Sequence, residues 1–193
     1  HHGALIVDEI YHELTYDESV PTALSVSDDI FVINSFSKYF NMTGWRLGWI
    51  VVPEAFIPAA DRLAQNLFLS APTVAQYAAL AAFEPDTLGI LEQRKAEFKQ
   101  RRDFLLPELK RLGFDISVVP QGAFYIYANC EKFTDDSYAL SQQLLEDAGV
   151  AITPGLDFGS NQASAYLRFA YTTSMERLKL GIERIEKFIQ SHP

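Results

Sequence analysis

A lysine that follows an apolar run is the residue of this sequence best suited to covalent chemistry. Lys38 lies in the segment NSFSKYFNMTGWRLGW (Asn34–Trp49), shortly after the predicted strand Ile30–Ile33. A lysine near apolar surroundings is costly unless it is partnered, neutralised or covalently used. The other lysines lie in polar or amphipathic stretches, where solvation is enough: Lys95, Lys99, Lys110, Lys132, Lys179 and Lys187. Lys38 is therefore the candidate nucleophile.

Polar groups that could share a ligand with Lys38 stand close to it or to the preceding strand. Asp8 and Lys38 follow two neighbouring predicted strands, at the carboxyl ends where open α/β sheets place their ligands. Tyr11 comes three residues after Asp8. Ser35 precedes Lys38 by three residues, and Arg46 follows it by eight. We expect these side chains to surround one small molecule.

One cofactor makes use of all these groups. The amine of Lys38 can form an imine with an aldehyde. A buried carboxylate, here Asp8, keeps a pyridine nitrogen protonated so that the ring can act as an electron sink. Tyr11 can donate to a phenolate oxygen, and Arg46 with Ser35 can bind a phosphate dianion. Together these demands describe pyridoxal 5′-phosphate.

Two segments of the chain carry a family resemblance. VDEIYHELTY and NSFSKYFNMTGWRLGW resemble the central motifs of the class I/II aminotransferases, the aspartate-aminotransferase-like family of fold type I pyridoxal-phosphate enzymes. The resemblance implies that Lys38 forms the imine, that Asp8 pairs with the pyridinium, and that Tyr11 binds the ring oxygen. It further implies that Ser35 and Arg46 hold the phosphate.

The resemblance extends into the C-terminal part of the chain. AYLRFAY matches the family segment whose arginine grips the substrate α-carboxylate, which assigns that role to Arg168. PQGAFYIY and ITPGLDFG resemble further small-domain segments of the family. One departure is Asn41, where close relatives commonly carry glycine, and we expect a local backbone adjustment there.

The order of the predicted elements places the chain in the α/β and α+β classes. With the resemblance, we expect residues 1–90 to form part of a three-layer αβα large domain of fold type I. Residues 91–112 are expected to form a linking helix, and residues 113–193 a smaller α+β domain. The strands are expected at 4–7, 30–33, 47–52, 114–119, 123–129, 150–153 and 166–171, and the helices at 53–69, 72–83, 87–112, 136–148 and 174–190.

Composition narrows the range of partners. The chain has 193 residues, a net charge of −9 and a single cysteine, Cys130. This charge offers no basic face for a nucleic-acid backbone. One cysteine excludes an internal disulfide and favours a reducing, cytoplasmic compartment. No apolar run reaches the roughly 18 residues that span a bilayer, so no membrane insertion is expected.

The chain is expected to be the C-terminal half of a longer protein and inactive by itself. It opens on a strand-like segment, and family members are about twice as long. The full-length protein is expected to be a homodimer that transfers an amino group between an amino acid and a 2-oxo acid. Two alternatives stay open: a C–S or β-lyase of the same fold, and an aminotransferase-like effector-binding domain of a transcription regulator. The substrates are not predicted.

Simpler roles also stay open for two arginines. Arg46 could pair with Glu9 or Glu54 at the surface, and Arg168 could pair with Asp157. Whether His1 and His2 are native is open as well.

Overall fold

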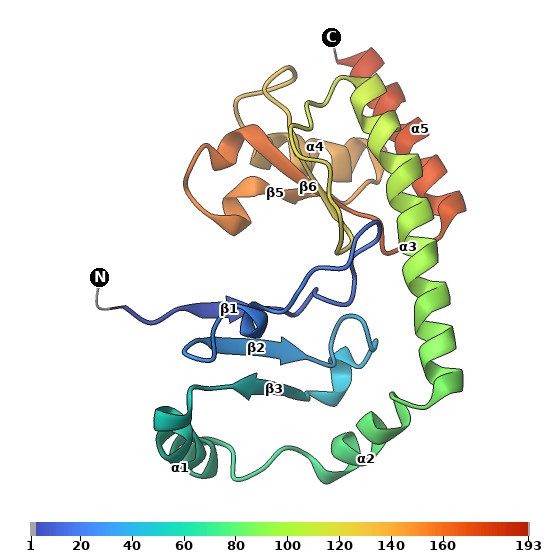
Figure 1. Cartoon of the computed structure of the whole chain (residues 1–193). Coiled ribbons are helices and arrows are strands. Elements are labelled where there is room, and N and C mark those ends of the chain that lie inside the picture. The colour runs from blue at the N-terminus through green and yellow to red at the C-terminus, as the bar shows by residue number, and fades with distance from the viewer. Residues whose placement is uncertain (1–2, 193) are drawn as a thin grey trace. The chain divides into compact units, whose positions relative to one another are not determined.

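The computed structural model describes residues 3–192, and the chain divides into two compact units, His1–Ala96 (unit 1) and Glu97–Pro193 (unit 2). His1 and His2 lie outside the described residues, so the question of whether they are native stays open. The division between the units falls inside one continuous helix, α3 (Pro85–Leu112), shown in green in Figure 1. The expected linking helix, 91–112, lies within α3, which continues through Pro107.

Unit 1 is built on a three-stranded sheet of order β1-β2-β3 (Figure 1). Its elements are β1 (Ile6–Asp8), η1 (Ala23–Ser25), β2 (Phe31–Ser35), η2 (Thr43–Trp45), β3 (Gly48–Val51), η3 (Glu54–Phe56), α1 (Ile57–Leu67), α2 (Thr73–Ala81) and the first part of α3. Strands β1 and β2 are parallel, whereas β2 and β3 are antiparallel. The central strand β2 alternates, with Val32 and Asn34 buried and Ile33 exposed, because successive side chains of a strand point to opposite faces.

The first strand is less buried than its sequence suggests. The continuous apolar run 4–7 is typical of a buried central strand, but β1 lies at the edge of the described sheet and pairs with β2 alone. Leu5 and Ile6 are 57% and 63% exposed. An apolar run indicates that a strand can be buried, but it does not indicate which segment of the protein would cover the strand.

Helices α1 and α2 lie within the expected ranges 53–69 and 72–83. Pro72 occupies the N-cap position of α2, and no side chain caps this helix. The amide of Ser70 donates to the carbonyl of Phe68 in the preceding turn. Pro72 suits the start of a helix because it lacks an N–H that would have no partner there.

Unit 2 has a three-stranded antiparallel sheet of order β4-β6-β5 with two further helices (Figure 1). Its elements are the second part of α3, β4 (Tyr125–Asn129), α4 (Ser137–Ala148), β5 (Thr153–Pro154), η4 (Gly155–Phe158), η5 (Ala163–Ala165), β6 (Tyr166–Ala170) and α5 (Met175–Ser191). The side chains of Leu109, Ile126, Leu144, Leu167 and Tyr171 are almost completely buried in its core.

The helix ends of unit 2 follow directly from local sequence. The carboxylate of Asp136 accepts from two amides of the first turn of α4, and Gly149 ends this helix with φ 63°. The hydroxyl of Ser174 accepts from the amide of Arg177 at the start of α5. Each of these caps forms hydrogen bonds with backbone groups at the helix end that would otherwise have no partner within the helix.

Two strands of unit 2 are shorter than expected. The stretch 114–119 was predicted to be a strand, but it contributes only an isolated bridge between Asp115 and Asn129. The strand expected at 150–153 is reduced to β5, Thr153–Pro154. In the first stretch, Phe114 and Ile116 are buried but Val118 is 75% exposed, so the alternating burial of a strand ends after Ile116.

Candidate active site

The parallel pairing of β1 and β2 brings their carboxyl ends to one edge of the sheet. Asp8 lies opposite Ile33, and the amide of Glu9 donates to the carbonyl of Ile33 over 2.8 Å. The residues that follow both strands therefore start from neighbouring points. The amine of Lys38 lies 5.9 Å from the ring centroid of Tyr11, at the limit of a cation–π contact. The structure thus brings together two of the predicted site residues from separate segments.

Asp8 is exposed, contrary to the sequence-based expectation of a buried carboxylate. Its Oδ1 accepts a hydrogen bond from the amide of Ile10 over 3.1 Å, which is a turn-stabilising contact. Asp8 ends the edge strand β1, so the exposure of the carboxylate follows from the exposure of the strand. Its predicted role toward a pyridine nitrogen stays a prediction.

The loop between β2 and β3 gathers hydroxyl groups. The hydroxyl of Ser35 donates to that of Ser37 over 2.9 Å and accepts from the amide of Ser37 over 3.0 Å. Thr43 Oγ1 donates to the carbonyl of Ser37 over 2.6 Å. These bonds fold the loop on itself and fix both serine side chains. Ser37 was not assigned a role from sequence, although its position two residues after Ser35 in a polar loop could have indicated one.

The backbone of the same loop contains two residues with positive φ. Asn41 and Arg46 have φ of 55° and 52°. Asparagine tolerates this left-handed conformation better than most residues, so Asn41 suits this position. The backbone adjustment expected at Asn41 stays a prediction.

The guanidinium of Arg46 is held by its own loop. Its Nη1 donates to the carbonyl of Thr43 over 2.9 Å, and the side chain is exposed. The expected alternative of a surface ion pair with Glu9 or Glu54 is not found among the described residues. The carboxylate of Glu9 instead accepts from the hydroxyl of Thr22 and the amide of Ala23.

A cavity of about 850 Å³ joins the serines and the arginine. Ser35, Ser37 and Arg46 line it together with apolar side chains that include Trp49 and Phe68. Hydroxyl donors beside a guanidinium form a donor set suited to a phosphate group, so the residues present fit the phosphate end of the predicted cofactor. Lys38, Tyr11 and Asp8 do not line this cavity. Among the predicted residues of unit 1, Ser35 and Arg46 thus share one cavity, while Lys38 lies near Tyr11 outside it.

Arg168 lies in unit 2, on strand β6, in an aromatic environment. Its guanidinium carbon is 4.1 Å from the ring centroid of Tyr125 and 4.1 Å from that of Phe158. Its Nε is buried and has no hydrogen-bond partner among the described residues. The alternative ion pair with Asp157 is not present in the described part of the chain. Tyr125 and Phe158 were not assigned from sequence, because stacking partners cannot be read from spacing along the chain.

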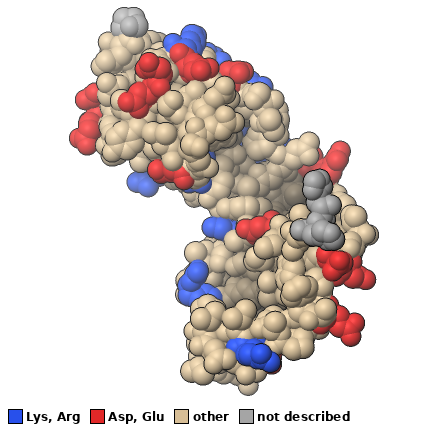
Figure 2. Space-filling view, turned by 90° about the vertical axis from the view of Figure 1, so that its left-hand side faces the viewer, with Lys and Arg blue, Asp and Glu red and all other residues tan. Residues whose placement is uncertain are grey.

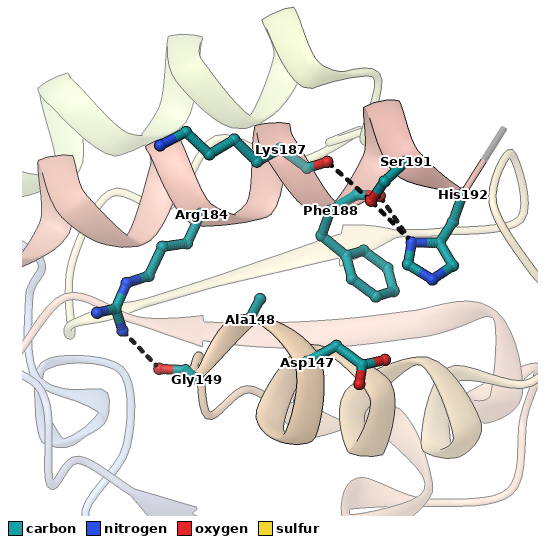
Figure 3. Close-up of a pocket in the computed structure, with 8 residues that line it drawn as sticks. All are labelled: Asp147, Ala148, Gly149, Arg184, Lys187, Phe188, Ser191 and His192. Carbon is teal, nitrogen blue, oxygen red and sulfur yellow. Dashed lines mark hydrogen bonds between the residues drawn. The ribbon is translucent and has the colours of Figure 1, made fainter.

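A separate hollow of about 560 Å³ lies in unit 2 between the ends of α4 and α5 (Figure 3). Arg184 Nη1 donates there to the carbonyl of Gly149 over 3.2 Å, and the hydroxyl of Ser191 donates to the carbonyl of Lys187 over 3.0 Å. Its polar groups thus serve largely to complete the helix ends. None of the predicted site residues lines it.

The charged side chains are mixed on the face shown in Figure 2, where Lys and Arg stand singly or in small groups among Asp, Glu and uncharged residues. In residues 3–192, no helix combines the length and the hydrophobicity that crossing a bilayer requires. The same residues contain no group of three or more His, Cys, Asp and Glu side chains placed to hold a metal ion.

The chain belongs to the aminotransferase class I and II family, whose model matches residues 1–185. The resemblance inferred from the two central motifs is therefore confirmed.

Individual relatives agree with this assignment. The chain is 39% identical to the valine–pyruvate aminotransferase of Mycobacterium tuberculosis, over 97% of this chain and 49% of the relative. It is also 39% identical to the (5-formylfuran-3-yl)methyl phosphate transaminase of Methanocaldococcus jannaschii, over 96% of this chain and 50% of the relative. The chain thus spans about half the length of the curated relatives it matches.

Solved structures give the same result for the fold. An aminotransferase from Mycobacterium tuberculosis matches with a TM-score of 0.94 and 38% identity, over 97% of this chain and 49% of that one. A putative aminotransferase from Silicibacter pomeroyi matches with a TM-score of 0.90 and 45% identity, over 97% of this chain and 50% of that one. The expected fold, type I of the aminotransferases, is confirmed.

Proposed function

We propose that the full-length protein is a pyridoxal-phosphate-dependent transaminase that moves an amino group between an amino acid and a 2-oxo acid. The observation that carries this proposal is the contact of Lys38 with Tyr11, beside a loop in which Ser35 and Arg46 line one cavity. The present chain supplies about half of such a protein, so we propose that it is inactive when produced alone.

The cofactor, when bound, supplies an electron sink for the charge that develops at the substrate Cα. Lys38 would hold the aldehyde through its amine and, once released, take the proton from the substrate Cα. Tyr11 would donate its phenolic proton to the ring oxygen. The guanidinium of Arg46 and the hydroxyl of Ser35 would hold the phosphate through charge-assisted hydrogen bonds. Asp8 would pair with the ring nitrogen, which requires the exposed carboxylate to be covered in the full-length protein.

Arg168 would bind the substrate through the α-carboxylate. A guanidinium presents parallel N–H donors that match the two oxygens of a carboxylate. The rings of Tyr125 and Phe158 beside it restrict the orientation of this planar group before any substrate arrives. A carboxylate bound through both oxygens fixes the orientation of the substrate and therefore of its Cα bonds. This orientation favours the cleavage of one Cα bond over the others.

The proposed setting of the enzyme follows the same reasoning. We propose a homodimer in the cytoplasm. The buried thiol of Cys130 suits a reducing compartment, because it is unpaired in the described chain.

The decisive experiment compares wild-type full-length protein with Lys38→Ala and with Lys179→Ala, which changes an exposed lysine on α5. We expect wild type and Lys179→Ala to show the imine absorbance of bound pyridoxal phosphate and to transfer amino groups only when a 2-oxo acid is supplied. Lys38→Ala should lose the absorbance and the transfer together. Retained turnover in Lys38→Ala would refute the role of this lysine, and release of pyruvate and ammonia without an oxo acid would indicate a lyase instead.

A further inference from the structure

The turn that carries Lys38 is fixed by an aromatic cluster. Phe36 and Phe40 lie on either side of Lys38 in the sequence, with ring centroids 4.8 Å apart. Both also contact Phe83 from the end of α2, at 5.9 and 5.4 Å. The ring of Tyr39 meets that of Phe40 edge to face at 5.1 Å. Aromatic packing of this kind restrains a turn more tightly than its backbone bonds alone.

Tyr39 adds a directional contact to this cluster. It is 9% exposed, and its hydroxyl donates to Oε1 of Glu92 on α3 over 2.6 Å. Glu92 in turn lies 3.8 Å from the amine of Lys95, one turn further along the helix. Burial, reinforced by the bond to Glu92, raises the pKa of Tyr39 far above its ordinary value. The hydroxyl therefore keeps its proton and remains a donor at neutral pH.

Lys38 and Tyr39 thus make different contacts from adjacent positions. The side chain of Tyr39 is bound to α3, while the amine of Lys38 lies over the ring of Tyr11. The backbone between them is also constrained, because the carbonyl of Lys38 accepts from the amide of Asn41 over 3.0 Å. A shift of the backbone at Tyr39 would therefore also displace Lys38, the adjacent residue in this turn.

We propose that Tyr39 is a positioning residue, whose hydrogen bond to Glu92 holds the turn so that the amine of Lys38 is aimed at the cofactor aldehyde. This inference rests on the proposed function. It assigns to α3 a part in the active site that the family match does not specify. The hollow beside Tyr39, about 420 Å³, is lined by the titratable groups of His12, Glu13, Glu92 and Lys95.

The test measures the affinity of the full-length protein for pyridoxal phosphate and the pH at which the absorbance of the bound cofactor changes. Tyr39→Phe removes one hydroxyl and keeps the ring. If Lys38 occupies the orientation that binds the cofactor for only part of the time, the affinity of the protein for the cofactor falls in proportion. We expect Tyr39→Phe to weaken cofactor binding about three- to tenfold, the range of one hydrogen bond, and to shift the absorbance transition.

Variants of Glu92 complete the test at a half-exposed position where folding is not at risk. Glu92→Ala removes the acceptor and should reproduce the effect of Tyr39→Phe, while Glu92→Gln keeps an acceptor oxygen and should stay within about twofold of wild type. Because the two residues act through one bond, the double variant Tyr39→Phe/Glu92→Ala should be no weaker than either single variant. Tyr77→Phe, which removes a hydroxyl from a side chain 72% exposed on α2, is the matched control and should leave both readouts unchanged.

The outcomes separate this inference from the proposed function. If wild type binds the cofactor through Lys38 but Tyr39→Phe and Glu92→Ala match it in affinity and in spectrum, the positioning role is refuted. A lower melting temperature of these variants with an unchanged spectrum would likewise reduce Tyr39 to a structural residue. If wild type itself fails to bind pyridoxal phosphate, the proposed function is refuted.

Discussion

The guanidinium of Arg168 lies 4.1 Å from the ring of Phe158, a residue ten positions earlier in the chain. Phe158 ends the short helix η4, which follows strand β5, and Arg168 lies on the neighbouring strand β6. Stacking on an aromatic ring orients the plane of an arginine while leaving its N–H donors, which lie at the edge of that plane, to bind an anion. The pair has the properties of a preformed carboxylate site.

Removing the ring of Phe158 should therefore weaken substrate binding. In the full-length enzyme, we expect Phe158→Ala to raise KM for both the amino acid and the oxo acid about tenfold, with kcat changed far less. The control is Leu156→Ala, which truncates an exposed apolar side chain of the same short helix. Equal KM values for wild type and Phe158→Ala would contradict the stacking role.

The phosphate end of the site can be tested with two ligands that differ only in the phosphate. We expect Arg46→Ala to weaken the binding of pyridoxal phosphate roughly 10- to 100-fold, the range of a charge-assisted hydrogen bond. The same variant should bind pyridoxal, which lacks the phosphate, as wild type does. Isothermal titration with both ligands checks this, and an equal loss for the two would place Arg46 elsewhere on the cofactor.

Sequence was a good guide to the local features of this chain. Helices α4 and α5 lie within two residues of their expected ends, since Asp136, Gly149 and Ser174 are strong capping residues that act over one turn. Lys38 and Tyr11 were expected to face one small molecule, and the amine lies 5.9 Å from the ring centroid because the parallel strands before them end side by side. Their shared ligand stays a prediction.

Features that depend on distant partners were not predictable in the same way. The burial of Asp8 was overestimated because an apolar strand does not reveal what covers it. The contact of Tyr39 with Glu92 joins residues 53 positions apart, and no spacing rule connects them. Tyr125 and Phe158 were likewise missed, because their role depends on tertiary contacts with Arg168.

Gly155 should be intolerant of any side chain. A Cβ built at this position would clash with the carbonyl of Ala163 and lie 2.7 Å from the hydroxyl of Tyr127. We expect Gly155→Ala to lower the free energy of unfolding by about 1–3 kcal/mol, as overpacking of an interior does. Gly181→Ala is the control, because that glycine lies inside α5 with nothing within 4 Å, and alanine there should stabilise by about 0.5–1 kcal/mol. Urea denaturation of both variants measures the difference, and an unchanged midpoint for Gly155→Ala would contradict it.

Cys130 should make the stability of the protein fall at alkaline pH. Burial raises the pKa of its thiol from 9.0 to about 11. Below pH 9 the thiol is protonated whether the chain is folded or unfolded. Above pH 9 the unfolded thiol releases its proton while the folded one retains it, so unfolding is favoured until about pH 11, by roughly 2–3 kcal/mol in total.

The matched measurement follows the unfolding free energy of wild type and Cys130→Ala between pH 8 and 11. We expect the advantage of wild type to shrink over this interval, because alanine carries no proton to lose. A constant difference between the two proteins across the whole interval would show that the thiol does not titrate differently on folding.

Strand β1 has a practical consequence for anyone who produces these 193 residues by themselves. In the described chain it hydrogen-bonds to a neighbour along one side only, next to the solvent-facing Leu5 and Ile6. Amide and carbonyl groups on the other side can accept a strand from another molecule, which is how aggregates begin. Low solubility of these residues on overexpression is the behaviour that such an exposed edge favours.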